Sequence, residues 1–148
     1  MMMIGRVTIL SIAIILFSPL ACVAADRVTT PRPNSHEGKA ILDTIYPAIE
    51  WQSAGPVEFY QLYLKVQDGW AVVRGRIRRP GGASVELRKV RLISNCATNR
   101  VDALVQLIGK LWYLVDWELC VSDAADDQET TSFYLWSKTK LPKGLFVK

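Results

Sequence analysis

Three arginines alternate along one short segment, and their type and spacing point most directly to chemistry: Arg74, Arg76 and Arg78. Side chains two residues apart on a β-strand project from the same face, so the three guanidinium groups would form a continuous strip. Guanidinium groups bind phosphate and carboxylate through paired hydrogen bonds. Further cations follow closely in the sequence, namely Arg79, Arg88, Lys89 and Arg91. The pattern predicts a surface for an anionic partner, either a protein or an envelope component such as lipopolysaccharide or an acidic glycan.

The same strip has a second interpretation that involves no partner. Glu58, Glu86 and Glu118 could pair with the arginines across neighbouring strands and leave an ordinary solvated sheet face. Two aromatic residues, Trp70 and Trp112, fall opposite the main apolar stripes, where exposed rings would widen a binding patch. The candidate binding residues are therefore Arg74, Arg76, Arg78, Trp70 and Trp112.

The sequence offers little for catalysis. His36, the only histidine, lies in the first turn of a predicted helix with no serine or cysteine motif placed to use it. Asp116 and Glu118 are two apart on a predicted strand, as paired carboxylates for acid-base chemistry can be, but their alternation with apolar residues fits an exposed sheet face better. We therefore predict that the protein is not an enzyme and holds neither a metal ion nor a cofactor.

Cys96 and Cys120 are the two cysteines outside the N-terminal segment. In an oxidising compartment an isolated pair is most simply a disulfide. The loop that it would close spans about 24 residues, which corresponds to roughly 3 kcal/mol in the chain-entropy model. Two unrelated buried thiols are the alternative, because free cysteine behaves as a small apolar residue.

The first 25 residues have the pattern of an export signal. Arg6 precedes a short apolar core from Val7 to Phe17, Ser18-Pro19 interrupts it, and small residues lead to a cleavage site near Ala25. The prediction is a periplasmic or secreted protein; a lipoprotein acylated at Cys22 is the less favoured alternative. Removing residues 1–25 lowers the formal net charge from +4 to +3, because Arg6 is the only charged residue removed. So small an excess does not indicate nucleic-acid binding.

Residues 26–34 contain Pro31 and Pro33 and predict a flexible tether with no packed role. Apolar residues at helical spacing then predict an amphipathic helix from about Ser35 to Trp51, with Asn34 and Glu37 as a capping box. Pro47 is expected to kink this helix or to end its regular part near Tyr46.

Alternating patterns then predict five strands, in segments near 59–66, 70–78, 84–93, 101–107 and 111–121. Asp68-Gly69 and Gly109-Lys110 are the expected hairpin turns. A final helix is expected from about Ala125 to Lys138. The fold class is therefore α+β: an N-terminal helix packed on a curved five-stranded antiparallel sheet, of cystatin-like or NTF2-like layout, plus a C-terminal helix. Residues 35–148 would form one domain.

Several short segments of the mature chain resemble a group of small exported bacterial proteins of uncharacterised function. They are Ala40-Ile41-Leu42-Asp43, Pro47 and Glu50, Pro56-Val57-Glu58-Phe59, Gly69-Trp70-Ala71-Val72-Val73, Ala103-Leu104-Val105, and Gly109-Lys110-Leu111-Trp112-Tyr113-Leu114-Val115-Asp116. The resemblance implies the helix-then-sheet layout and brings no catalytic residues.

The expected function is that of an exported, non-catalytic module that binds a protein or an anionic envelope component, with peripheral membrane contact as a further option. The alternative is a carrier of small apolar ligands, with a pocket between the first helix and the sheet. The sequence leaves the partner and the oligomeric state open.

Overall fold

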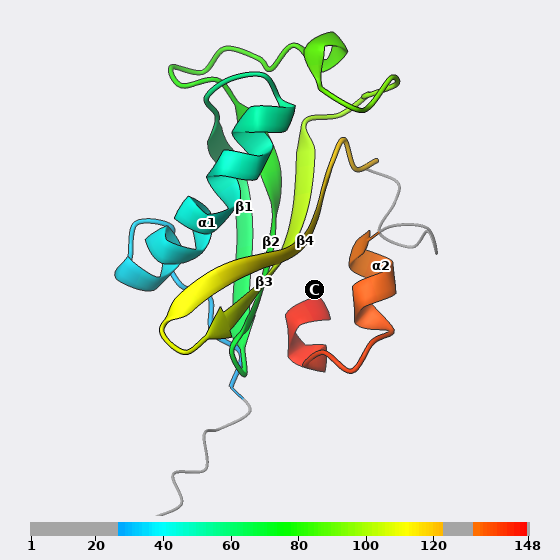
Figure 1. Ribbon diagram of the computed structural model, residues 1–148. Helices are drawn as coiled ribbons and strands as arrows, with labels where there is room; N and C mark the ends of the chain where they lie inside the picture. Colours follow the sequence, from blue (N-terminus) through cyan, green and yellow to red (C-terminus); the bar gives the residue numbers. More distant parts are fainter. Residues whose placement is uncertain (1–26, 123–131, 148) are drawn as a thin grey trace, which may run out of the picture.

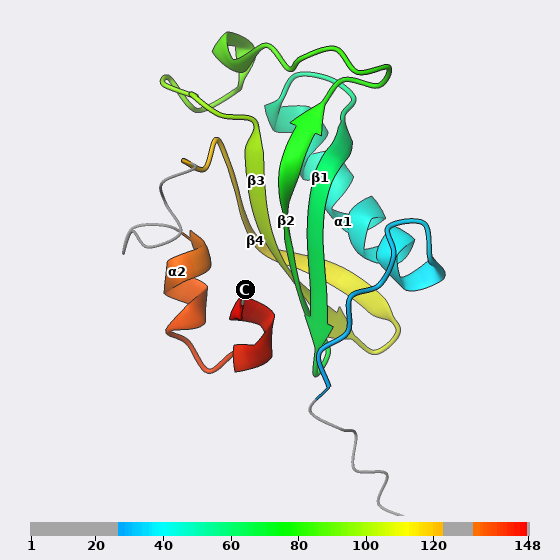
Figure 2. The ribbon, with the colours of Figure 1, turned by 180° about the vertical axis from the view of Figure 1, so that it is seen from behind.

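One antiparallel sheet separates two layers in the computed structural model, which describes residues 27–122 and 132–147. Helix α1 (His36–Gln52) covers one face of the sheet. The C-terminal segment, with helix α2 (Ser132–Ser137) and the 3-10 turn η3 (Lys143–Phe146), lies against the other face (Figures 1 and 2). The predicted export signal lies outside the described residues.

The sheet has four strands in the order β1 (Glu58–Gln67), β2 (Trp70–Arg78), β3 (Arg100–Ile108) and β4 (Leu111–Leu119). Asp68 and Gly69 join β1 to β2 with positive φ at both positions, 51° and 74°. That conformation matches the right-handed twist of the flanking strands, as the sequence predicted. At the turn after β3, Gly109 alone takes a positive φ, 64°, and Lys110 does not.

Both faces of the central strands are buried. On one face, Ile41, Ile45 and Ile49 of α1 pack against alternate residues of β2 and β3, namely Ala71, Val73, Ile77, Val101, Ala103 and Val105. On the other face, Val72 and Leu104 pack against Trp136 and Leu145 of the C-terminal segment. Burying each large aliphatic side chain contributes roughly 1.5–3 kcal/mol, so the two layers hold the sheet from both sides.

The predicted strand at 84–93 is wrong, and the sheet has four strands where five were expected. Residues 79–99 form a long loop that contains only the 3-10 turn η1 (Leu87–Lys89). Val85 and Val90 are buried in the core on the α1 side of the sheet. A loop that inserts two valines into a core produces apolar positions resembling those of a strand, so the local pattern predicts a strand there.

The predicted C-terminal helix is also wrong. Residues 123–131 lie outside the described part, and the remainder of the expected range holds only the six-residue α2, after which the chain closes with the 3-10 turn η3. Helix α2 and η3 do not join into one longer helix. Leu141 is followed by Pro142 and Gly144, and proline and glycine interrupt helical hydrogen bonding.

Three local features differ from the sequence analysis. Ser35, one residue after the predicted cap, accepts a hydrogen bond from the Gly38 amide at 3.1 Å and begins α1. The helix passes through Pro47 without a break and ends at Gln52. Thr29, in the predicted tether, forms an antiparallel bridge with Val66, so this segment extends the edge of the sheet at β1.

A β-bulge at Val115 changes which residues of β4 face α1. The register passes from Leu104–Asp116 to Val105–Leu114 and leaves Val115 unpaired in the ladder. Trp112 and Leu114 therefore pack on the α1 side, while Tyr113 is exposed. A bulge places two residues opposite one, which reverses the parity of the strand beyond it.

Candidate functional site

The cations of the chain gather at one end of the sheet. Residues 74–100 contain eight Arg and Lys residues and one acidic residue, Glu86. They comprise the last part of β2, the long loop 79–99 and the first residue of β3, and Figure 1 shows this loop beyond the end of the strands, beside the C-terminus of α1. We call residues 74–100 the basic end.

The three arginines of the predicted strip have three different surroundings. Arg74 lies deepest, next to the buried carboxylate of Asp102, with Nε and Oδ1 3.3 Å apart. Arg100 contacts the same carboxylate, with Nη2 3.3 Å from Oδ2. The Asp102 side chain is 0% exposed, and those of Arg74 and Arg100 are 13% and 12% exposed. Such a buried carboxylate requires its cationic partners, so this cluster holds β2 and β3 together.

Arg78, at the end of β2, is held by the edge strand β1. Its Nε lies 2.7 Å from Oε1 of Glu58 on β1, and its guanidinium group lies 5.3 Å from the ring centre of Tyr60. Both members of the ion pair are substantially exposed, so the pair contributes at most about 1 kcal/mol. The pairing of Arg78 with Glu58 matches the second interpretation of the arginine strip.

Arg76, the middle arginine, lines a cavity of about 200 Å³. Its Nη1 donates a hydrogen bond of 3.0 Å to Oδ1 of Asn99. Two segments of the long loop form the rest of the cavity wall, with Ser84, Val85 and Leu87 from one and Ala97, Thr98 and Asn99 from the other. A guanidinium group beside hydroxyl and amide groups can hold a small anionic group by charge-assisted hydrogen bonds.

Hydrogen bonds fix the cavity wall at Asn99. Its Nδ2 donates to the carbonyl oxygen of Ile77 at 2.7 Å and to the Tyr60 hydroxyl at 3.1 Å. The Ile77 amide donates in turn to the Asn99 carbonyl oxygen at 3.0 Å. Asn99 therefore orients Arg76 from a fixed position, which reduces the entropy that a bound anion would cost.

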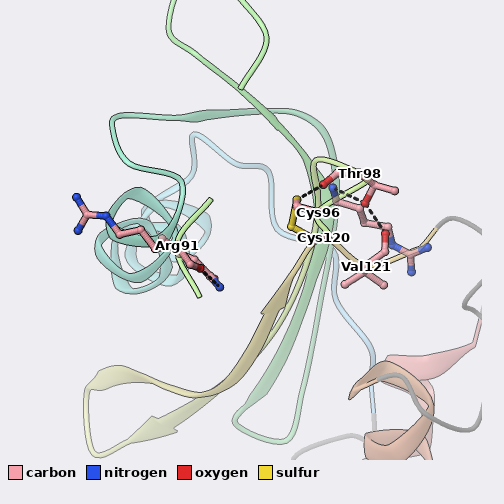
Figure 3. The surroundings of a disulfide bond; sticks show 7 residues. Arg91, Cys96, Thr98, Cys120 and Val121 are labelled. Carbon is pink, nitrogen blue, oxygen red and sulfur yellow. Dashed lines mark hydrogen bonds between the residues drawn. A yellow bond between two sulfur atoms is a disulfide. The ribbon is translucent and has the colours of Figure 1, made fainter. Parts of the chain in front are cut away.

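The disulfide between Cys96 and Cys120 ties the other side of the wall to the sheet, and this confirms the predicted pairing. Its two Cα atoms are 5.2 Å apart, and it joins the long loop to the residue directly after β4. Next to it, the Thr98 hydroxyl donates to the Val121 carbonyl oxygen at 2.6 Å, as Figure 3 shows. Thr98 and Asn99 therefore lie between the disulfide and β3, and both attachments fix them.

The loop is also attached to the C-terminus of α1. Arg79 donates to the carbonyl oxygens of Ser53 and Pro56, at 2.7 Å and 2.9 Å. The Arg91 amide donates to the Gln52 carbonyl oxygen at 2.8 Å, and its guanidinium group lies 5.3 Å from the ring centre of Trp51. Figure 3 shows Arg91 at this helix end, apart from the disulfide. A helix C-terminus presents unpaired carbonyl groups and a partial negative charge, so cations dock there favourably.

Glu86 is the one carboxylate of the basic end. Lys89 donates to it across one turn at 2.8 Å, and this hydrogen bond together with the positive charge of Lys89 holds the pKa of Glu86 below its ordinary value. Both side chains are well exposed. The lowered pKa of Glu86 therefore reflects its pairing with Lys89.

Neither tryptophan of the predicted binding set lies at the basic end. Trp70 begins β2, at the opposite end of that strand from Arg78, and packs against Val72 and Leu104 with the C-terminal segment. Trp112 packs on the α1 side, and its carbonyl oxygen accepts from the Thr44 hydroxyl at 3.4 Å. The structure therefore separates Arg74, Arg76 and Arg78 from Trp70 and Trp112; a binding role for these five residues stays a prediction.

Sequence reasoning missed the residues that complete the cavity, Ser84, Thr98 and Asn99, and the buried partner Asp102. The sequence held one signal for Asn99. It directly precedes β3, a position where a side-chain amide commonly forms hydrogen bonds with backbone groups.

A second cavity, of about 180 Å³, lies between residues 30–33 and β1, where Leu62, Tyr63 and Leu64 line it. Neither of these two cavities lies between α1 and the sheet, where the carrier alternative requires one. In the described ranges, no cluster of three or more His, Cys, Asp or Glu side chains could hold a metal ion. In those ranges there is also no helix with the length and apolar character needed to cross a membrane.

No family model, no curated protein and no solved structure matches this chain.

Proposed function

We propose that the protein is an exported, non-catalytic binding module whose basic end holds an anionic group of an envelope component. The observation that carries the proposal is the position of Arg76 in the wall of a cavity that also presents Ser84, Thr98 and Asn99. Phosphate is the anion whose oxygens best use a guanidinium group and hydroxyl donors together.

The distribution of charge supports an anionic ligand at this end. Of the 17 Arg and Lys residues in residues 26–148, eight lie in 74–100. Three of the 14 carboxylates accompany them: Glu86 within that range, and Asp102 and Glu58, which pair with its arginines. The remaining part of the mature chain therefore has nine cations and 11 carboxylates. A positive end on a molecule that is otherwise slightly negative orients it toward an anionic surface as it approaches.

Export is the second part of the proposal. The disulfide between Cys96 and Cys120 is compatible with an oxidising compartment. The residues before Asp26 have the charge and apolar pattern of a signal that is removed during export.

Titration of the mature chain with inorganic pyrophosphate, followed by calorimetry, tests the anion site. Arg76→Gln is expected to weaken binding at least about tenfold, because one charge-assisted hydrogen bond to an anion contributes roughly 1.5–3 kcal/mol. The triple variant Arg88→Gln, Lys89→Gln, Arg91→Gln should weaken binding mainly at low salt.

A charge-matched control removes three exposed cations elsewhere, Arg27→Gln, Arg32→Gln and Lys39→Gln. This variant should bind pyrophosphate as the parent chain does. Equal binding by the parent chain and Arg76→Gln, or equal loss in both triple variants, would remove the assignment of the site to the basic end.

A further inference from the structure

The turn between β3 and β4 carries a concentration of exposed apolar side chains. Of the ten large apolar side chains that are exposed in the described residues, five lie within residues 107–115: Leu107, Ile108, Leu111, Tyr113 and Val115. We call these five residues the apolar tip. Leu111 is 63% exposed and Ile108 is 56% exposed, on either side of the Gly109-Lys110 turn.

The fold does not require apolar residues at these positions. Ile108 pairs with Leu111 across the hairpin, and neither belongs to the two buried clusters of the sheet. Figures 1 and 2 both show this hairpin projecting from the sheet at the end away from the long loop. Exposed aliphatic side chains on a projecting turn are unfavourable in water unless a partner covers them.

The chemistry of the apolar tip fits a lipid surface. Residues 103–115 contain no Asp or Glu and a single cation, Lys110, at the apex of the turn. A lysine can keep its ammonium group among phosphate headgroups while neighbouring aliphatic side chains enter the acyl region. Tyrosine, here Tyr113, is favoured at the boundary between the two.

We propose that the apolar tip inserts into the outer part of a lipid bilayer, with Ile108 and Leu111 in contact with acyl chains and Lys110 at the headgroups. This membrane contact is a second binding surface and does not depend on the anion site.

The distance between the two surfaces makes them physically separable. Arg76 of the anion cavity pairs with Arg100 at the start of β3, and Ile108 ends the same strand. The eight residue steps between Arg100 and Ile108 span about 26 Å. That exceeds the Debye length of about 8–10 Å at moderate salt, so the basic end adds little to attraction at the tip. Binding through the tip should therefore resist salt.

Sedimentation with vesicles of phosphatidylcholine containing a minor fraction of phosphatidylglycerol tests the proposal on the mature chain. The parent chain should sediment with the vesicles at both low and high salt. The variant Ile108→Ser, Leu111→Ser should reduce the partition coefficient at least about tenfold. It removes the two aliphatic side chains whose transfer from water to the acyl chains favours binding.

The matched control replaces two exposed leucines elsewhere, Leu92→Ser and Leu135→Ser, and should partition as the parent chain does. Circular dichroism of both variants verifies that the sheet is kept. Lys110→Glu should weaken binding to vesicles with phosphatidylglycerol more than to vesicles of phosphatidylcholine alone.

Three results would overturn the proposal. The parent chain could fail to sediment, or the control could lose as much binding as the tip variant. Binding could also vanish with salt and in Arg76→Gln, which would assign the vesicle contact to the basic end. Light scattering adds a further outcome against it: a dimer that the tip substitutions convert to a monomer would show that a second copy covers the tip.

Discussion

The basic end and the apolar tip lie at opposite ends of β3 and differ in how they are built. At the basic end, a long loop is fixed by a disulfide, by hydrogen bonds from Arg79 to the residues after α1, and by Asn99. At the tip, a two-residue turn suffices, and the exposed groups are aliphatic. Charged side chains need fixed partners to act as a site, whereas a lipid surface adapts to any exposed apolar group.

With the two proposed contacts, one small sheet would bind two kinds of surface. Electrostatic binding at the basic end would be sensitive to salt, and apolar contact at the tip would not. Changes confined to one end should therefore leave the other unaffected.

Asp102→Asn should lower the free energy of unfolding more than any other substitution at the basic end. It removes the buried negative charge between Arg74 and Arg100 and leaves two largely buried cations beside each other. Loss of one partner of a buried ion pair costs about 3–5 kcal/mol, which urea unfolding will show. Adding Arg100→Gln should recover part of this loss; no recovery would mean that the charge of Asp102 is not what matters.

The next effect is expected from the disulfide. Cys96→Ser with Cys120→Ser should lower the free energy of unfolding by roughly 3 kcal/mol, because the closed loop no longer restricts the unfolded chain. Pyrophosphate binding should weaken, since Thr98 and Asn99 lose their attachment, while vesicle partition of the folded protein should stay the same. A parallel loss of both activities would argue that the two ends are not independent.

Arg78→Gln tests the contribution of the exposed ion pair of the basic end to stability. Because the pair with Glu58 is exposed, the unfolding free energy should change by no more than about 1 kcal/mol. A loss as large as that of Asp102→Asn would show that exposed and buried arginines contribute alike.

The smallest effect concerns Glu86, whose pKa Lys89 holds below its ordinary value. In Lys89→Gln the pKa of Glu86 should rise toward that value, as an NMR titration of the carboxyl carbon can follow. Because the folded-state pKa is lowered, the interaction is present above the ordinary pKa and is lost as the pH falls through the lowered one. An unchanged pKa would mean that Lys89 is not what lowers the pKa of Glu86.

Local signals predicted the parts of the fold that depend on neighbouring residues. The spacing of Ile41, Ile45 and Ile49 predicted α1, and Asp68-Gly69 predicted its turn. The long loop was mistaken for a strand because Val85 and Val90 are buried by tertiary contacts that no local pattern reveals. The bulge at Val115 was also missed. The turn between β3 and β4 sets the register of the two strands only up to the first irregular pair, and no local pattern marks where that pair lies.

The candidate site was predicted only in part. The arginines stand out in the sequence because they alternate, but their partners come from other strands and loops. Asp102 faces Arg74 through the pairing of β2 with β3, and Asn99 reaches Arg76 from the end of the loop. Such partners follow from tertiary register, so a sequence pattern can propose an anion site without identifying which arginine lines the cavity.

One NMR experiment on the labelled mature chain tests the central claim that the two ends bind by different physics. Pyrophosphate should shift the amide signals of Arg76, Ser84, Thr98 and Asn99 and leave those of the apolar tip in place. Micelles of a short-chain phosphatidylcholine should shift the signals of Ile108, Lys110 and Leu111 and spare those of the basic end, at low and at high salt. Shifts of the same residues by both additions, or shifts spread over the whole sheet, would contradict the account.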